Sequence, residues 1–220
     1  MGQPHGWITG KSRLLHPPSS VPCMETTTDM AGQLPRFAVV DVETSGLSTR
    51  RHRVLQVAVV TVEDGLIVDE WSSLIGSRWP LQRVGPRRIH GISRADLRGA
   101  PRQREVFAEF GRRLDGAVFT AHNVDFDWAF IERAARRSGT SFQPVAALCT
   151  LRLSRKLDPD RALSHRLTDV AERYGVINDR PHDALFDARA TALVLPHLLE
   201  AHRVQSGADL DPLFQRPGQR

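Results

Sequence analysis

The chain has 220 residues, of which 40% are hydrophobic, and this length suits one folded domain with tails. Its formal net charge is +5 and its isoelectric point is about 10.1, which favours a partner rich in phosphate, although a bias towards arginine produces the same balance. No apolar run approaches the ~20 residues of a membrane span, and no signal peptide is evident. We therefore expect a cytoplasmic or nucleoid-associated protein without a membrane partner.

Residues 1–34 contain many Pro, Ser, Thr and Gly residues without a hydrophobic period, which predicts a disordered leader. Met24 and Met30 are alternative start sites within it. Cys23 and Cys149 lie far apart and match no metal-ligand spacing. This pattern indicates two free thiols in a reducing compartment.

Three apolar stretches rich in β-branched residues open the folded domain, which we place at residues 35–203. The first stretch begins at Phe37, and the second runs from 54 to 62. Glu63-Asp64-Gly65 is a turn signal, and residues 66–75 form the third strand. The three strands are expected to pair as an antiparallel meander.

The remainder of the domain alternates helices and strands after a basic stretch, residues 78–104, that Pro and Gly interrupt. Apolar spacing predicts helices at 105–114, from about 124 to 137, and at 151–157, 167–174 and 183–201, with short strands at 117–120 and 145–148. Leu185, Leu193, Leu195 and Leu199 are expected on the buried side of the last helix. This order predicts an α/β fold with a mixed sheet and helices on both faces. Residues 204–220 are polar and predict a flexible tail.

Two acids, Asp41 and Glu43, interrupt the first strand just before Thr44-Ser45-Gly46 ends it. Residues two apart on a strand point to the same face. Two acids on one face of a buried strand are costly unless a cation lies between them, and a divalent metal ion is the usual solution. For an isolated Asp-x-Glu we would prefer the alternative that both lie at the solvated end of a strand, but other parts of the chain argue against it.

Two further acids lie beside apolar segments. Asp127 follows a buried strand at the opening of a helix, and Asp187 lies in the first turns of the last helix. Four carboxylates saturate the charge of two divalent cations, which is the standard arrangement for in-line displacement at phosphorus. His182, five residues before Asp187, is placed to act as a general base on the attacking water.

Each of these positions has an ordinary structural alternative. Asp127 can serve as a negative charge at a helix N-terminus, and His182 can be a loop histidine. Asp183 and Asp187 are four residues apart, so either can be the ligand, although Asp183 is better placed as the N-cap. Taken jointly, in this order and these contexts, the acids and the histidine favour the functional interpretation.

The three motifs are Asp41-x-Glu43-Thr44, Asn123-x-x-Phe126-Asp127 and His182-x-Ala184-x-x-Asp187. Over roughly residues 36–202 the chain resembles the DnaQ-like 3′–5′ exonucleases of the DEDD type. Because Asp183 stands where one subgroup has tyrosine, the histidine-bearing subgroup (DEDDh) is the better match. The resemblance implies a ribonuclease-H-like five-stranded sheet, an antiparallel meander followed by parallel strands. It also implies two Mg²⁺ ions, for which Mn²⁺ can substitute, held by Asp41, Glu43, Asp127 and Asp187, with His182 as the catalytic base.

The resemblance further implies three kinds of contact to the terminal nucleotides. A hydrophobic wedge presses on the terminal base, the backbone of a turn meets the terminal 3′-hydroxyl, and a further motif packs against the last nucleotides. The matching positions are Thr44, Leu47, Ile89, His90, Asn123 and Phe126. Ordinary core packing is the alternative for Leu47 and Ile89, and turn capping is the alternative for Asn123.

The leading interpretation is a metal-dependent enzyme that releases nucleoside 5′-monophosphates from single-stranded DNA 3′ ends, in proofreading or repair, similar to the proofreading epsilon subunit of DNA polymerase III. An exoribonuclease of the oligoribonuclease or ribonuclease T kind is the second interpretation. A non-catalytic nucleic-acid-binding or polymerase-binding module is the third, and the intact acids argue against it. A DNA polymerase or a sliding clamp is the expected protein partner. Residues 209–214 faintly resemble a clamp-docking peptide, but Pro212 interrupts the spacing, so a coincidental apolar tail is preferred.

Overall fold

The structure is a computed structural model that describes residues 33–76 and 83–216. Its strands are β1 (Phe37–Thr44), β2 (Val54–Glu63), β3 (Leu66–Leu74), β4 (Val118–Ala121) and β5 (Ala147–Cys149). Its helices are α1 (Arg87–His90), α2 (Arg94–Arg98), α3 (Gln103–Leu114), α4 (Val124–Ser138), α5 (Thr150–Lys156), α6 (Leu167–Arg173) and α7 (Ala184–Ala201), followed by the 3-10 helix η1 (Gly207–Leu213).

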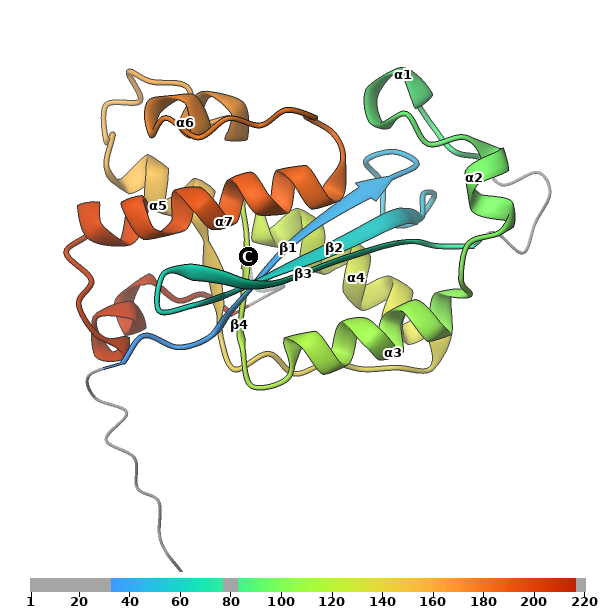
Figure 1. Ribbon diagram of the computed structural model, residues 1–220, viewed down its shortest axis with the longest axis horizontal. Coiled ribbons are helices and arrows are strands. Elements are labelled where there is room, and N and C mark those ends of the chain that lie inside the picture. Colours follow the sequence, from blue (N-terminus) through green and yellow to red (C-terminus); the bar gives the residue numbers. More distant parts are fainter. Residues whose placement is uncertain (1–32, 77–82, 217–220) are drawn as a thin grey trace, which may run out of the picture.

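The five strands form one sheet in the order β3-β2-β1-β4-β5 (Figure 1). The pairs β1–β2 and β2–β3 are antiparallel, whereas β1–β4 and β4–β5 are parallel. Asp64 and Gly65, both with positive φ, form the two-residue loop that joins β2 to β3, as tight hairpins require. The prediction of a mixed sheet that begins with an antiparallel meander is confirmed.

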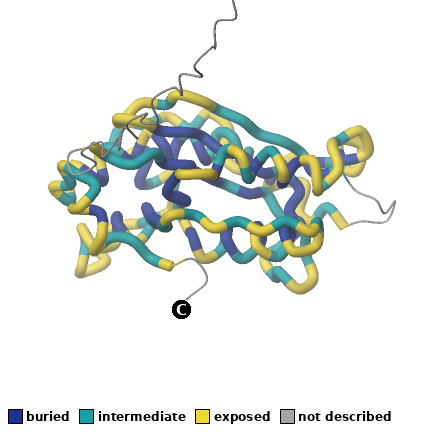
Figure 2. The backbone as a smooth tube through the Cα atoms, turned by 90° about the horizontal axis from the view of Figure 1, so that it is seen from below, coloured by how far each residue is buried: buried dark blue, intermediate teal, exposed yellow. Residues whose placement is uncertain are grey.

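Side chains along β1 alternate between two cores, as the period of two dictates. Ala38, Val40 and Val42 pack in one core with residues of α3 and α4. Phe37 and Val39 pack in the other core with residues of α5, α6 and α7. Helices therefore cover both faces of the sheet (Figure 1), and buried positions run through the middle of the molecule (Figure 2).

Helix α7 is the longest helix and packs along the sheet with an apolar side. Leu195 and Leu199 are buried, as expected, but Leu193 is 42% exposed, so its assignment to the buried side is wrong. Two residues advance a helix by about 200°, which turns Leu193 away from the sheet when Leu195 faces it. No helix in the described ranges is both long enough and apolar enough to cross a membrane.

The basic stretch before α3 contains two short helices that apolar spacing did not predict. Gly91, with φ of 71°, ends α1 in the left-handed conformation. Ser93 and Asp96 then form a reciprocal capping box that starts α2. Each of these helices buries a single residue, His90 or Leu97, which is too little for hydrophobic periodicity to reveal.

Residues 204–216 differ from the flexible tail that we expected. Leu210 in η1 is fully buried, and Leu213 and Phe214 pack against the core under α7. Gln215 exchanges two backbone hydrogen bonds with Ala147, at 2.9 and 3.3 Å, and so covers the edge of β5. A few apolar side chains within a polar sequence therefore anchor this segment, and they are not free to serve as a docking peptide. The expected disordered leader lies almost entirely outside the described residues.

Candidate active site

Strand β1 carries the first two acids at its carboxyl end. Asp41 and Glu43 continue the series of Phe37 and Val39, so they lie on the face of the sheet that α7 covers. Both acids are partly buried. The negative charge of Asp187 on α7 acts on both of them.

The N-terminus of α7 is fixed beside these acids. The Asp183 side chain accepts a backbone N–H hydrogen bond from the first turn at 3.1 Å, which confirms it as the N-cap. Gln56 on β2 lies opposite Glu43 in the sheet register. Its amide donates to Asp183 Oδ1 and accepts from the Ala184 N–H, both at 3.3 Å. One glutamine thus ties the helix end that carries Asp187 to the strand beside Glu43.

Asp127 reaches the site from α4, which packs against the opposite face of the sheet. Backbone N–H groups of Phe126 and Asp127 donate to the Asn123 carbonyl at 2.9 and 3.3 Å and close the turn between β4 and α4. Asp127 is only 4% exposed. Its carboxylate accepts hydrogen bonds from its own N–H and from that of Val42, which brings it against β1.

The four acids share a site where burial and mutual repulsion disfavour their charges. Burial, aided by the charge of Asp187, raises the pKa of Glu43 from 4.5 to about 8 and, despite its backbone hydrogen bonds, the pKa of Asp127 from 3.8 to about 8. Burial and then the charges of Asp127, Asp187 and Glu43 hold the pKa of Asp41 well above its usual range. Burial also raises the pKa of Asp187, against hydrogen bonds that stabilise its charge.

This donor set has the chemistry of a divalent-cation site. Carboxylate oxygens are the ligands that Mg²⁺ and Mn²⁺ prefer. A carboxylate oxygen of Glu43, one of Asp187 and a ring nitrogen of His182 all lie within 4.8 Å of one another. Asp41 and Asp127 are outside that set, but the charge of Asp127 acts on Glu43, and the charges of Glu43 and Asp187 act on Asp41. Cations bound among these side chains offset the repulsion that otherwise raises their pKa.

His182 lies at the exposed rim of the acid cluster. Its backbone N–H donates to Asp187 Oδ2 at 3.0 Å, which ties the preceding loop to α7. Its φ of 68° is in the left-handed region, which costs a non-glycine residue ~1–3 kcal/mol and is common at functional sites. The exposed ring near Glu43 and Asp187 is suited to accept a proton or to ligate a cation.

The positions matched to substrate contacts differ in their burial and in their bonding. Leu47 is 84% exposed and Ile89 is 47% exposed, so their alternative assignment to the core is wrong. Asn123 is exposed and makes no side-chain capping bond, so its carbonyl rather than its amide closes the turn. The Thr44 hydroxyl donates to the Gly46 carbonyl at 3.0 Å. The partly buried Phe126 ring lies 5.0 Å from that of Phe130, centroid to centroid.

His90 differs from the other proposed contacts because both ring nitrogens are used within the chain. Its Nδ1 accepts from the Ile92 N–H at 3.1 Å, so Nε2 carries the proton and donates to the Val84 carbonyl at 2.9 Å. His90 is also buried. Its position therefore allows packing and support of α1 rather than a new hydrogen bond to a substrate.

Two residues that organise the site were not identified from the sequence. Gln56 is a polar residue inside the apolar run of β2, and that interruption was an available signal. Asn178 donates to Asp187 Oδ1 at 2.6 Å, so both oxygens of Asp187 are held in place. The Asn178 contact depends on the path of a loop, for which the sequence contains no periodic signal.

The raised pKa values predict how the stability of the metal-free protein depends on pH. In the unfolded chain these carboxyl groups ionise near pH 4, whereas folded Glu43 and Asp127 ionise near pH 8. The folded state binds more protons between these limits, so the free energy of unfolding should fall as the pH rises from about 4 to 8. Urea denaturation in a chelator across this range measures the effect.

Saturating Mg²⁺ should restore stability at pH 8 by binding the ionised acids. The Asp127→Asn variant removes one titrating group, so its metal-free stability should change less with pH. A flat profile for the unsubstituted protein would contradict the repulsion inferred for this cluster.

Comparison with known proteins identifies a family that spans most of the folded domain. The sequence profile of the family described as "Exonuclease" (RNase T) matches residues 38–195. The chain is 33% identical over 183 residues to the PolC-type DNA polymerase III of Lacticaseibacillus paracasei, covering 83% of this chain and 12% of that protein. It is 32% identical over 169 residues to the 3′-5′ exonuclease DinG of Bacillus subtilis, and the match covers 76% of this chain and 18% of that protein. The chain therefore spans only a small part of these relatives.

Solved structures agree on the fold. Exonuclease X, in complex with 5′ overhanging duplex DNA, superposes with a TM-score of 0.59 at 24% identity and covers 79% of this chain and 98% of its own. A 3′-exonuclease that recognises the 3′ end of a histone mRNA stem-loop superposes with a TM-score of 0.66 at 15% identity. This match covers 77% of this chain and 83% of that one. One fold thus serves proteins that bind DNA and proteins that bind RNA, and the five-stranded sheet predicted from the motifs is shared with them.

Proposed function

Because the chain belongs to the RNase T-type exonuclease family, we propose that it hydrolyses nucleic acid from the 3′ end and releases nucleoside 5′-monophosphates. The observation that supports this most strongly is the convergence of acids from β1, α4 and α7 beside the exposed ring of His182. Such a cluster destabilises the metal-free fold, which a binding-only module has no reason to retain. Enzymatic turnover explains its presence.

In this proposal each side chain has one task. Asp41, Glu43, Asp127 and Asp187 hold two Mg²⁺ ions, which when bound supply Lewis-acid stabilisation of the charge on the reacting phosphate. His182 accepts the proton of the water that attacks phosphorus. The bond to the 3′-oxygen of the preceding nucleotide breaks, which leaves a free 3′-hydroxyl on the shortened strand.

The remaining proposed contacts position the terminal nucleotide. The exposed Leu47 and Ile89 present apolar surface to its base, and Phe126 supports the same pocket. The backbone at Thr44 meets the 3′-hydroxyl, and the free amide of Asn123 faces the strand. His90 contributes by packing, because its ring nitrogens are already satisfied.

Single-stranded DNA is the proposed substrate because the two similar proteins are a DNA polymerase and an exonuclease of the DinG type. We further infer a role in proofreading or repair, beside a DNA polymerase or as a separate enzyme. RNA is the second candidate, because a structural neighbour recognises histone mRNA. A sliding clamp is not proposed as a partner, since the segment that suggested it is packed into the core.

Digestion of 5′-labelled single-stranded DNA, duplex DNA and RNA tests the proposal. With Mg²⁺ or Mn²⁺ we expect a ladder of products shortened from the 3′ end, fastest on single-stranded DNA. A chelator should abolish cleavage, and Ca²⁺ should bind without comparable turnover because its coordination is looser. Metal binding is read independently as a rise in melting temperature.

The outcomes separate the alternatives. A ladder on RNA alone would assign the enzyme to the exoribonuclease interpretation. Binding of either strand without cleavage, in the presence of a metal-induced stability gain, would indicate a non-catalytic module. Full activity in a chelator would contradict the metal assignment.

A further inference from the structure

A cleft of about 370 Å³ lies at the N-terminus of α4, the helix that carries Asp127. Its walls are the turn between β4 and α4, helix α5, and residues 157–166 between α5 and α6, which we name the 157–166 loop. Three arginines line it: Arg155, Arg161 and Arg166. The cleft therefore combines concave shape with concentrated positive charge.

The three guanidinium groups are available to a ligand. All three residues are exposed. Within residues 33–76 and 83–216, none of these side chains forms an ion pair or a hydrogen bond. Asp160, in the same loop, does not line the cleft. Three unpaired arginines in one cleft create the potential that attracts phosphate groups.

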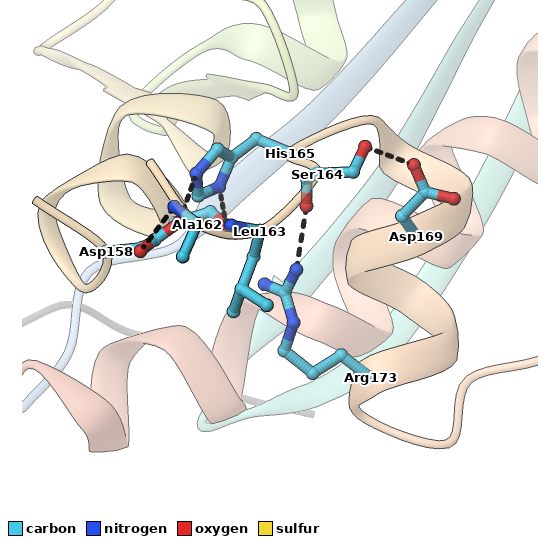
Figure 3. Close-up of polar contacts among 8 residues, drawn as sticks. Asp158, Ala162, Leu163, Ser164, His165, Asp169 and Arg173 are labelled. Atoms are coloured by element: carbon cyan, nitrogen blue, oxygen red, sulfur yellow. Dashed lines mark hydrogen bonds and ion pairs between the residues drawn. The ribbon is translucent and has the colours of Figure 1, made fainter. Parts of the chain in front are cut away.

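The 157–166 loop is held in one conformation by its own polar contacts (Figure 3). The Asp158 carboxylate accepts from the N–H groups of Ala162 and Leu163 at 3.1 and 2.8 Å and lies 3.1 Å from His165 Nε2. His165 Nδ1 lies 2.8 Å from the hydroxyl of Ser154, a buried residue on α5. The Asp158 carboxylate therefore faces the interior of the loop, with its side chain 12% exposed. A second acid, Asp169 on α6, accepts from the Ser164 hydroxyl.

One residue of the 157–166 loop has a strained backbone conformation. Arg161 has φ of 55°, a left-handed conformation that costs an L-residue ~1–2 kcal/mol and that glycine would adopt freely. The Asp158 carbonyl accepts from the Arg161 N–H, and the Asp158 carboxylate accepts from the two following N–H groups, which offsets that cost. Arg161 lines the cleft from this position.

Leu151 and two histidines also line the floor of the cleft, and the arginines supply its positive charge. His122 Nδ1 lies 3.0 Å from the Thr150 hydroxyl, and its Nε2 lies 2.9 Å from the His165 carbonyl. Burial lowers the pKa of His122, so its ring stays neutral at physiological pH. Both ring nitrogens are occupied, which fixes the floor.

The position of the cleft relates it to the proposed reaction. Asn123 lines the cleft and precedes Asp127 by one helical turn, about 6 Å along the axis of α4. Of the proposed contacts to the terminal base, Leu47 follows β1, Ile89 lies on α1 and Phe126 lies on α4. The cleft extends towards α5 and α6, which lie away from α1 in Figure 1. A strand whose 3′ end occupies the acid cluster can thus continue past Asn123 into the cleft.

We propose that this cleft is a subsite for the phosphodiester backbone of the substrate strand, on the 5′ side of the terminal nucleotide. The proposal rests on the proposed function, since it assigns the direction of the strand from the site of hydrolysis. Arg161 and Arg166 bind backbone phosphates through charge-assisted hydrogen bonds, and Arg155 contributes from α5. Because these contacts do not involve bases, the subsite selects for strand length rather than sequence.

The test compares a dinucleotide, too short to reach the cleft, with a fifteen-nucleotide oligothymidylate. In the Arg161→Ala/Arg166→Ala variant, KM for the long substrate should rise about ten-fold, whereas KM for the dinucleotide should change by less than two-fold. The slope of log(kcat/KM) against log salt for the long substrate should decrease by about 1.4, for two lost phosphate contacts on a single strand. The Arg161→Lys/Arg166→Lys variant should retain most of the affinity, and Arg104→Ala, an exposed substitution on α3, is the matched control.

An equal rise in KM for both substrates would overturn the proposal, because it would place these arginines in the hydrolytic site or in a role in folding. An unchanged KM for both substrates would also overturn it, because the arginines would then not bind the strand. If the unsubstituted protein cleaves neither substrate, the proposed function fails, but the cleft remains testable. Fluorescence anisotropy in a chelator should then still show about ten-fold weaker binding of the labelled oligonucleotide by the double alanine variant. Equal binding by both proteins, or displacement of the oligonucleotide by micromolar inorganic phosphate, would contradict a strand-binding subsite.

Discussion

Replacing Asp127 by asparagine should reduce turnover by roughly a thousand-fold or more, comparable to losing a principal electrostatic contact of a transition state. The substitution retains the size of the side chain, but its amide cannot balance the charge of a bound cation. The metal-free protein should at the same time become more stable, by roughly 1–3 kcal/mol, because a buried group with a raised pKa no longer has to ionise. Asp41→Ala, Glu43→Ala and Asp187→Ala should also reduce turnover strongly. Single-turnover kinetics and urea denaturation of the same preparations measure the two effects.

Asp183 is the matched control for this prediction. It lies near the same cluster, but its carboxylate caps α7 and bonds to Gln56. Asp183→Ala should cost ~0.5–2 kcal/mol of stability, as the loss of an N-cap does, and should reduce turnover far less than Asp187→Ala. If Asp183→Ala were the inactive variant and Asp187→Ala remained active, our assignment of the ligand on α7 would be wrong.

Removing an acid of the cluster is expected to raise stability and to lower activity. Acids that lower the stability of the fold are conspicuous in the sequence, which explains why the acid cluster was predictable. Asp41 and Glu43 lie in a strand whose other side chains alternate between two cores. The face of the strand that carries the two acids is therefore covered by one of these cores. Asp127 and Asp187 each open a helix that packs on the sheet, and a buried acid without a partner is too costly to be accidental. Each position conflicts with its apolar context, and such local conflicts mark functional sites.

Contacts between distant segments were not predictable in the same way. Gln56 and Asp183 are 127 residues apart, and their hydrogen bond exists only because β2 and α7 pack together. The tail was misjudged because its few apolar residues, Leu210, Leu213 and Phe214, are too short a series to show a helical period. The arginines that line the cleft come from α5 and from the 157–166 loop, so only the fold shows that they lie together.

His182→Ala should lower turnover by roughly a hundred- to ten-thousand-fold, which is the contribution of a positioned general base. Only a neutral imidazole accepts a proton, and histidine side chains change charge between about pH 5 and 8. Turnover of the unsubstituted protein with Mg²⁺ should therefore rise with pH across this range and then level off. The variant should lose that dependence, because the side chain that accepts the proton is absent. Stopped-flow rates at saturating substrate, measured from pH 5 to 9 on both proteins, provide the profiles.

The geometry also allows His182 to ligate a cation, since its ring nitrogen lies within 4.8 Å of carboxylate oxygens of Glu43 and Asp187. The general-base role and the ligand role of His182 predict different effects of His182→Ala on metal affinity. Isothermal titration with Mn²⁺ measures this affinity without any turnover. A general base can be removed with little change in the dissociation constant, whereas removal of a ligand weakens binding about ten-fold or more. The backbone N–H of residue 182 still bonds to Asp187 in the variant, so the loop should keep its position. Near-normal turnover with an unchanged pH profile would show that water loses its proton without help from this side chain.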